Sequence, residues 1–109
     1  MATTVKVLGQ AAPAATTNTD LYTVPAATST VCSTLTVANR SGSASSFRVA
    51  VRPGGATLAN EHYVYYGIEI PGGDAFAATL GITLAATDVV TVYASSADLS
   101  FSIFGEETA

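Results

Sequence analysis

Apolar and polar residues alternate along several short segments of the chain, with the period of a half-buried β-strand. The clearest run spans residues 29–39, which is rich in β-branched side chains and would place Val31, Ser33, Leu35 and Val37 on one face. Groups of Gly, Pro, Asn and Ser separate the segments and indicate turns. We predict strands over 4–8, 19–24, 29–39, 47–52, 61–70, 75–80 with an extension over 82–84, 88–94 and 99–104.

About eight such segments, with no useful helical period, predict an all-β fold. The expected architecture is an antiparallel β-sandwich of about eight strands, in a single domain over residues 1–109, because so short a chain does not provide two independent cores. Order along the chain does not fix which strands pair, so jelly-roll and Ig-like arrangements both stay open. We expect the last two segments to form a hairpin, and residues 9–18, rich in Ala and Thr, to form an extended arm or loop.

A cluster of tyrosines in segment 61–70 is the main candidate for a contact surface. Strict alternation turns Val64 and Tyr66 toward the core and leaves Tyr63 and Tyr65 outside. Tyrosine is enriched at protein interfaces, although such rings also simply cover a sheet surface. Carbohydrate-binding faces usually add Trp, which this chain lacks, so we favour a protein partner. The predicted interface residues are Tyr63, Tyr65, Arg48 and Arg52, the two arginines facing outward by the same alternation.

Charge is scarce and unevenly placed. Only 11% of residues are charged, and the formal net charge is -4. Residues 1–52 hold all four cations and one acid, whereas residues 53–109 hold seven acids and no cation. Either strands from the two halves are neighbours within one sandwich, or a basic edge of one subunit meets an acidic edge of the next. An acidic chain without a long apolar run or a signal-peptide pattern predicts no nucleic-acid partner, no membrane span and no Sec-type export.

The residues that usually carry catalysis or bind metals are few. Cys32 is the only cysteine and His62 the only histidine, which excludes an internal disulfide, a cysteine cluster and a His-rich metal site within one chain. We expect Cys32 to be a small packed side chain and His62 to lie at the surface. Glu61 and Glu69 would stand about 27 Å apart along an extended strand, too far to act together. We therefore expect no enzyme activity, no cofactor and no metal.

The chain resembles a family of small virion structural proteins of tailed bacteriophages over nearly its whole length. The residues that carry the resemblance are Leu8–Pro13 (LGQAAP), Asp20–Pro25 (DLYTVP), Val37–Arg40 (VANR), Phe47–Val51 (FRVAV), Gly81–Leu84 (GITL), Asp88–Ser95 (DVVTVYAS) and Phe104–Glu106 (FGE). These motifs are structural and specify no reaction. The resemblance implies assembly into a particle through repeated contacts with copies of the chain and with a capsid or tail protein.

The resemblance makes a capsid decoration (cement) protein the first expectation. Such a protein would be a homo-oligomer, for example a trimer, seated over junctions between subunits of the major capsid protein and stabilising the shell. One alternative is a tail, baseplate or fibre-associated component on the same fold. Another is a host-receptor or glycan-binding module. The expected location is the virion, after synthesis in the host cytoplasm.

Overall fold

The computed structural model describes residues 2–109, and these residues form eight strands. The strands are β1 (Thr3–Ala11), β2 (Thr19–Thr23), β3 (Ser29–Asn39), β4 (Ser45–Arg52), β5 (Tyr63–Ile70), β6 (Ala75–Leu84), β7 (Val89–Ala94) and β8 (Leu99–Thr108). Two short 3-10 turns, η1 (Pro53–Gly55) and η2 (Asn60–His62), lie in the connection between β4 and β5. The predicted all-β fold class is confirmed.

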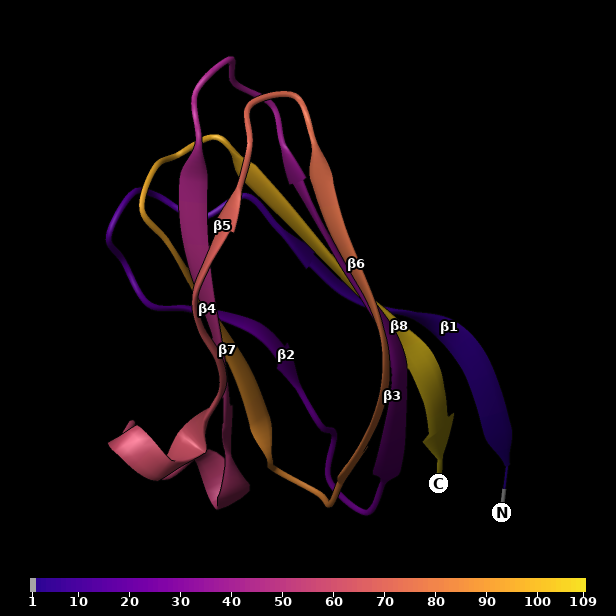
Figure 1. The fold of residues 1–109 in the computed structure, drawn as a ribbon. Helices are drawn as coiled ribbons and strands as arrows, with labels where there is room; N and C mark the ends of the chain where they lie inside the picture. The colour runs from indigo at the N-terminus through magenta and orange to yellow at the C-terminus, as the bar shows by residue number, and fades with distance from the viewer. Residues whose placement is uncertain (1) are drawn as a thin grey trace.

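Two four-stranded antiparallel sheets pack against each other, in the orders β1-β8-β3-β6 and β2-β7-β4-β5 (Figure 1). The first strand pairs with the last, and every connection except β4–β5 crosses from one sheet to the other. This order is that of a jelly roll, because an Ig-like sandwich keeps its first two strands in one sheet. The expected hairpin of residues 88–94 with 99–104 is wrong, since β7 and β8 belong to different sheets.

The pairing of β1 with β8 holds the two ends of the described chain together (Figure 1). Ala2 and Ala109 exchange two backbone hydrogen bonds of 2.9 Å. Residues 9–11, expected in an arm or loop, instead continue β1, and residues 106–108 continue β8. Residues 12–18 do form a loop, and the Thr16 amide donates to the carbonyl of Ala94 at 2.8 Å. The segment 9–18 is thus a strand end and a tethered loop.

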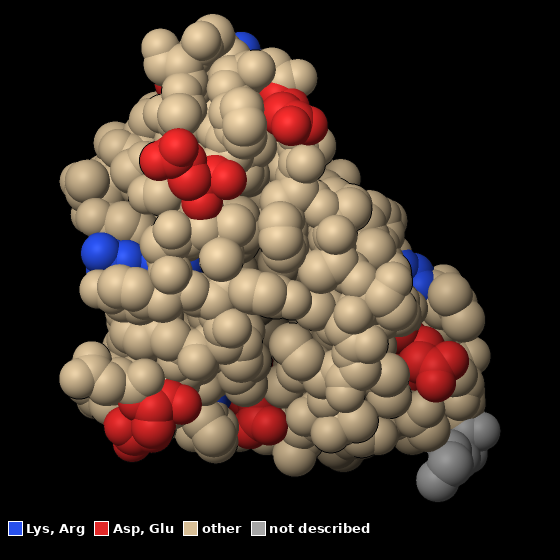
Figure 2. Space-filling view, in the orientation of Figure 1, with Lys and Arg blue, Asp and Glu red and all other residues tan. Residues whose placement is uncertain are grey.

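Charged side chains are few and lie apart on the surface. Figure 2 shows them as separate groups within a wide uncharged area. With only 11% of residues charged, most of the outer faces are built from small polar and apolar side chains. Such a surface has weak charge–charge repulsion toward other proteins of the same composition.

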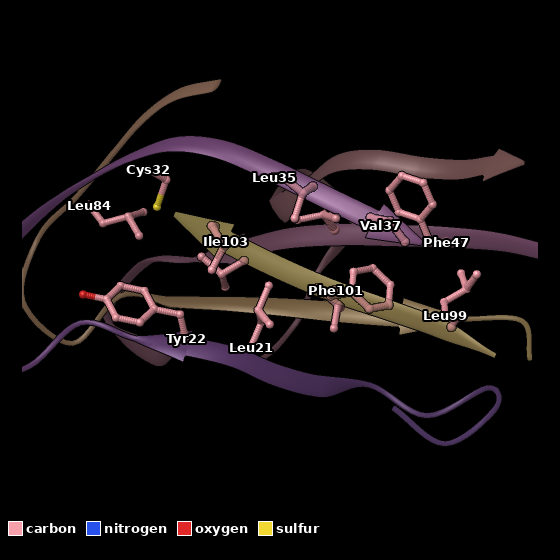
Figure 3. Packing of buried hydrophobic residues seen from close by; sticks show 14 of the residues in the cluster. Leu21, Tyr22, Cys32, Leu35, Val37, Phe47, Leu84, Leu99, Phe101 and Ile103 are labelled. Carbon is pink, nitrogen blue, oxygen red and sulfur yellow. The ribbon is translucent and has the colours of Figure 1, made fainter. Parts of the chain in front are cut away.

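The core lies between the two sheets and contains four aromatic rings in contact. Phe47 of β4 packs against Phe76 and Phe101, at ring-centre distances of 5.2 and 5.9 Å. Figure 3 shows Phe47 and Phe101 toward one end of the core and Tyr22 and Cys32 toward the other. The alternation predicted in the last strand is confirmed, because its apolar residues are buried and its serines face outward. The buried residues there are Leu99, Phe101 and Ile103, between Ser100 and Ser102.

A β-bulge changes the alternation predicted in β3. The register against β8 shifts between Cys32 and Thr34, which leaves Ser33 as an extra residue. Thr30 and Cys32 are therefore buried before the bulge, whereas Val31, predicted to share the face of Leu35 and Val37, is 39% exposed. Cys32 is a packed, fully buried side chain, as predicted, and burial raises the pKa of its thiol to about 11.

Candidate functional site

An arginine clamped between two tyrosine rings stands out on the outer face of the β2-β7-β4-β5 sheet. The guanidinium carbon of Arg48 lies 4.3 Å from the ring centre of Tyr66 and 4.2 Å from that of Tyr93. The three residues are direct cross-strand neighbours on β5, β4 and β7. Because β4 runs between β5 and β7, an aromatic ring lies on each side of the guanidinium and restricts its orientation.

Two bulges in β5 decide which tyrosines reach this face. Gly67 adopts a φ of +74° and is an extra residue against β4, and Val64 is a second extra residue. A positive φ costs a glycine little, so the first bulge is encoded in the sequence. Tyr66, predicted to face the core, consequently faces outward and is 61% exposed. The alternation-based prediction is wrong at this residue.

The same bulges turn the side chain of Tyr65 toward the core, opposite to that of Tyr66. Its ring packs against Phe47 and Phe76, with ring-centre distances of 6.3 and 5.4 Å, so it lines the core and not the outer face. The predicted outward orientation of Tyr65 is wrong for the physical reason that an extra residue inverts the alternation. Tyr63 lies outside as predicted, with its ring edge-on to that of Tyr66 at 4.9 Å. Tyr63, Tyr66, Arg48 and Tyr93 form one cluster, which we call the clamp face.

Arg52 has an intramolecular role at the end of the same strand. Its guanidinium pairs with the carboxylate of Asp20 at 3.0 Å and donates to the hydroxyl of Thr91 at 3.0 Å. Two further bonds go to the carbonyls of Gly55 and Ala56. The Arg52 side chain therefore connects the η1 turn and β2 to β4. It is not part of the clamp face.

Arg48 differs from the other cations in having no acceptor among residues 2–109. Lys6 pairs with Glu107 at 3.1 Å, and Arg40 donates to the carbonyl of Ala97 at 2.8 Å. The Lys6–Glu107 pair confirms that strands from the cationic and acidic halves are neighbours within one sandwich. A basic edge meeting the acidic edge of another subunit stays a prediction. Within residues 2–109 the guanidinium of Arg48 contacts the two rings but donates no hydrogen bond.

The outer face of the other sheet carries exposed valines and few charges toward one end. Val5 and Val7 of β1 are 80% and 48% exposed. In the register of the sheet, Glu106 lies directly between Val5 and Val31. Beside them is a shallow hollow of about 250 Å³ lined by Val5, Val31, Ser33, Gly105 and Glu106. Exposed apolar residues grouped on one face are typical of a protein-contact surface.

Groups that could carry chemistry are separated in the described part of the chain. Residues 2–109 contain no group of three or more His, Cys, Asp or Glu side chains that could hold a metal ion. His62 is half-buried, and its Nδ1 accepts a hydrogen bond of 3.0 Å from the Ala59 amide, which closes the η2 turn. Over the same residues, no helix has the length and apolar character needed to cross a bilayer.

No protein-family model, no curated protein and no solved structure matches this chain. Alternation identified Arg48 and Tyr63 but missed Tyr66 and Tyr93. The signal that could have found Tyr66 is Gly67, since a glycine inside a strand pattern often marks a bulge.

Proposed function

We propose that the chain is a structural protein of a bacteriophage particle, most specifically a capsid decoration protein. In this role it bridges neighbouring subunits of the major capsid protein and performs no reaction. The jelly-roll strand order supports the proposal, because this fold is common in viral capsid domains. The same fold also occurs in lectins and enzymes, so the fold alone does not specify the function and the exposed surfaces are needed to assign it.

The observation that carries the proposal is the placement of the large exposed apolar side chains. Val5, Val7 and Val31 lie on one sheet, and Val64 and Tyr66 lie on the other. A protein with a contact surface on each side of a sandwich is suited to join two neighbours. Few charges oppose that contact, so burial of these side chains would stabilise the assembly. In this proposal the partners are other copies of the chain and the major capsid protein. The location is the virion.

Counting copies in purified particles tests the proposal. Quantitative mass spectrometry of intact particles should find hundreds of copies per particle for a decoration protein. Mild heating should then release this chain selectively and leave shells that rupture at a lower temperature. A few to a few dozen copies would favour the alternative of a tail, baseplate or fibre component on the same fold. Absence from particles would refute both.

Glycan or host-receptor binding is the second alternative, favoured by the aromatic rings of the clamp face. It predicts that the isolated chain binds host cells or a glycan array. The double variant Tyr63→Ala with Tyr66→Ala should abolish that binding, because both rings lie on the outer face. Tyr65, which lines the core, is not suitable for this test.

A further inference from the structure

The clamp face carries a second unpaired charge beside Arg48. Glu69 lies between Ile68 and Ile70, which both turn toward the core, so its carboxylate points outward and is exposed. In the register it faces Ser46, two residues along β4 from Arg48. Among residues 2–109 Glu69 has no hydrogen-bond or ion-pair partner, and it does not pair with Arg48 itself. One patch thus presents an unpaired cation and an unpaired anion side by side.

We propose that the clamp face binds the same face of a second copy, and that Arg48 of each copy pairs with Glu69 of the other. A patch with both signs side by side is complementary to itself under a two-fold rotation. An axis between the two positions brings each guanidinium over the opposite carboxylate. The stacked guanidinium is already oriented, so its N–H groups can form a two-pronged bond with a carboxylate at little cost in side-chain freedom.

The apolar residues around these charges support the same occupant. Tyr66, 61% exposed, is the cross-strand neighbour of Arg48 on β5, and Val64, 47% exposed, lies two residues further along the same strand. The Tyr66 ring would be covered in the dimer. Tyrosine and arginine are among the residues enriched at the centres of protein interfaces. The opposite sheet lacks this self-complementarity, because Glu106 lies between valines there, with no unpaired cation beside it. The second copy is therefore better matched to the clamp face than to the outer face of the β1-β8-β3-β6 sheet.

Charge reversal in the full chain tests the dimer by sedimentation velocity over a range of concentrations. The wild-type chain should associate into a dimer. Arg48→Glu and Glu69→Arg should each raise the dissociation constant at least tenfold, because each variant places two like-charged pairs across the two-fold axis. Mixing the two single variants should restore association, since both cross-contacts then join Glu to Arg. The double variant R48E/E69R should also dimerise.

Glu106→Arg is the matched control, because it makes the same charge change on the opposite sheet and should leave the dimer unchanged. If R48E fails to fold after losing its ring contacts, E69R still tests the proposal, since Glu69 makes no hydrogen bond or ion pair within residues 2–109. A wild-type chain that stays monomeric, single variants that dimerise like wild type, or a mixture that fails to associate would each overturn it.

The dimer proposal rests on the proposed function only because it treats the clamp face as an assembly surface. Different experiments can refute the dimer and the decoration role. A monomeric chain that is present in hundreds of copies per particle would remove the dimer and keep the decoration role. If R48E then weakened attachment to the capsid, the occupant of the clamp face would be the capsid protein, and the two-fold contact would be wrong.

Discussion

The phenol oxygen of Tyr22 lies 2.5 Å from Oε2 of Glu107 and so joins strand β2 of one sheet to strand β8 of the other. The other carboxylate oxygen accepts a bond of 3.1 Å from the Lys6 ammonium, and the hydroxyl of Thr30 lies 2.8 Å from the phenol. Burial, together with Glu107, raises the pKa of Tyr22 to about 12, so the phenol stays protonated and donates. This network closes the sandwich at the end where the chain termini meet.

Acid should weaken the fold through Glu107. The hydrogen bonds from Tyr22 and Lys6 lower the pKa of this carboxyl below its usual value. Its contribution to stability is therefore fully present above pH 4.5 and disappears as the pH falls through the lowered value. Glu107→Gln should unfold at lower urea concentration than wild type at pH 7, and the difference should shrink toward pH 2. The exposed-site variant Glu61→Gln should track wild type at every pH; equal pH profiles for all three proteins would contradict the role of Glu107.

Gly105 should tolerate no side chain. A Cβ atom there would collide with the carbonyl oxygen of Val31 and lie 3.0 Å from the Cα of Cys32, beside the β3 bulge. Gly105→Ala should therefore lower the free energy of unfolding by about 3 kcal/mol. Gly81→Ala is the control, because a Cβ at that position meets no atom within 4 Å, and it should stay within about 1 kcal/mol of wild type. Equal effects in urea unfolding would show that the strands do not approach so closely.

The two adjacent tyrosines of β5 should differ in their effect on stability. Tyr65→Ala leaves a cavity beside Phe47 and Phe76 and should cost about 3 kcal/mol. Tyr66→Ala removes an exposed ring that contacts Arg48 and Tyr63 and should cost about 1 kcal/mol. Thermal and urea unfolding of both variants measure the difference. The reverse order of effects would mean that β5 follows simple alternation and has no bulge at Gly67.

Asn39 should be irreplaceable at the corner where β3 meets the β5–β6 turn. Its side chain is buried, and its amide donates to the carbonyls of Ser43, Ile70 and Pro71 at 2.8, 3.0 and 3.3 Å. Asn39→Asp places a carboxylate against these carbonyls and should cost about 3 kcal/mol or more. The same change at the exposed Asn60 should alter stability by less than about 0.5 kcal/mol. A mild effect at residue 39, measured by urea unfolding at pH 7, would contradict the burial of this amide.

The strands themselves were predictable from the sequence because side chains alternate from Ser45 to Val49 in β4 and from Leu99 to Gly105 in β8. Phe47 and Val49 are buried, as alternation predicts, and Arg48 between them points outward. The order of strands in the sheets was not predictable, because the pairing of β1 with β8 joins residues about a hundred positions apart. Local turn signals carry no information on such contacts, which also explains why β7 and β8 were expected to pair.

The β-bulges are the reason why alternation did not predict which tyrosines lie on the outer face. The bulge in β5 is marked by Gly67, but no glycine marks the one at Ser33, which becomes visible only in the register against the partner strand. Ser33 in β3 and Gly67 in β5 each invert the alternation, and the second exchanges the roles of Tyr65 and Tyr66. Tyr93 was missed for a different reason: its place beside Arg48 depends on β7 lying next to β4.

Because Ala2 and Ala109 are hydrogen-bonded to each other, the two ends of the described chain lie at one corner of the sandwich. A tag or cargo domain fused to either end would leave from the same corner of the sandwich, away from the β4–β5 connection (Figure 1). A short glycine linker across that corner would close the polypeptide into a circle, and new ends could then be opened beside the exposed Thr57 in the β4–β5 connection.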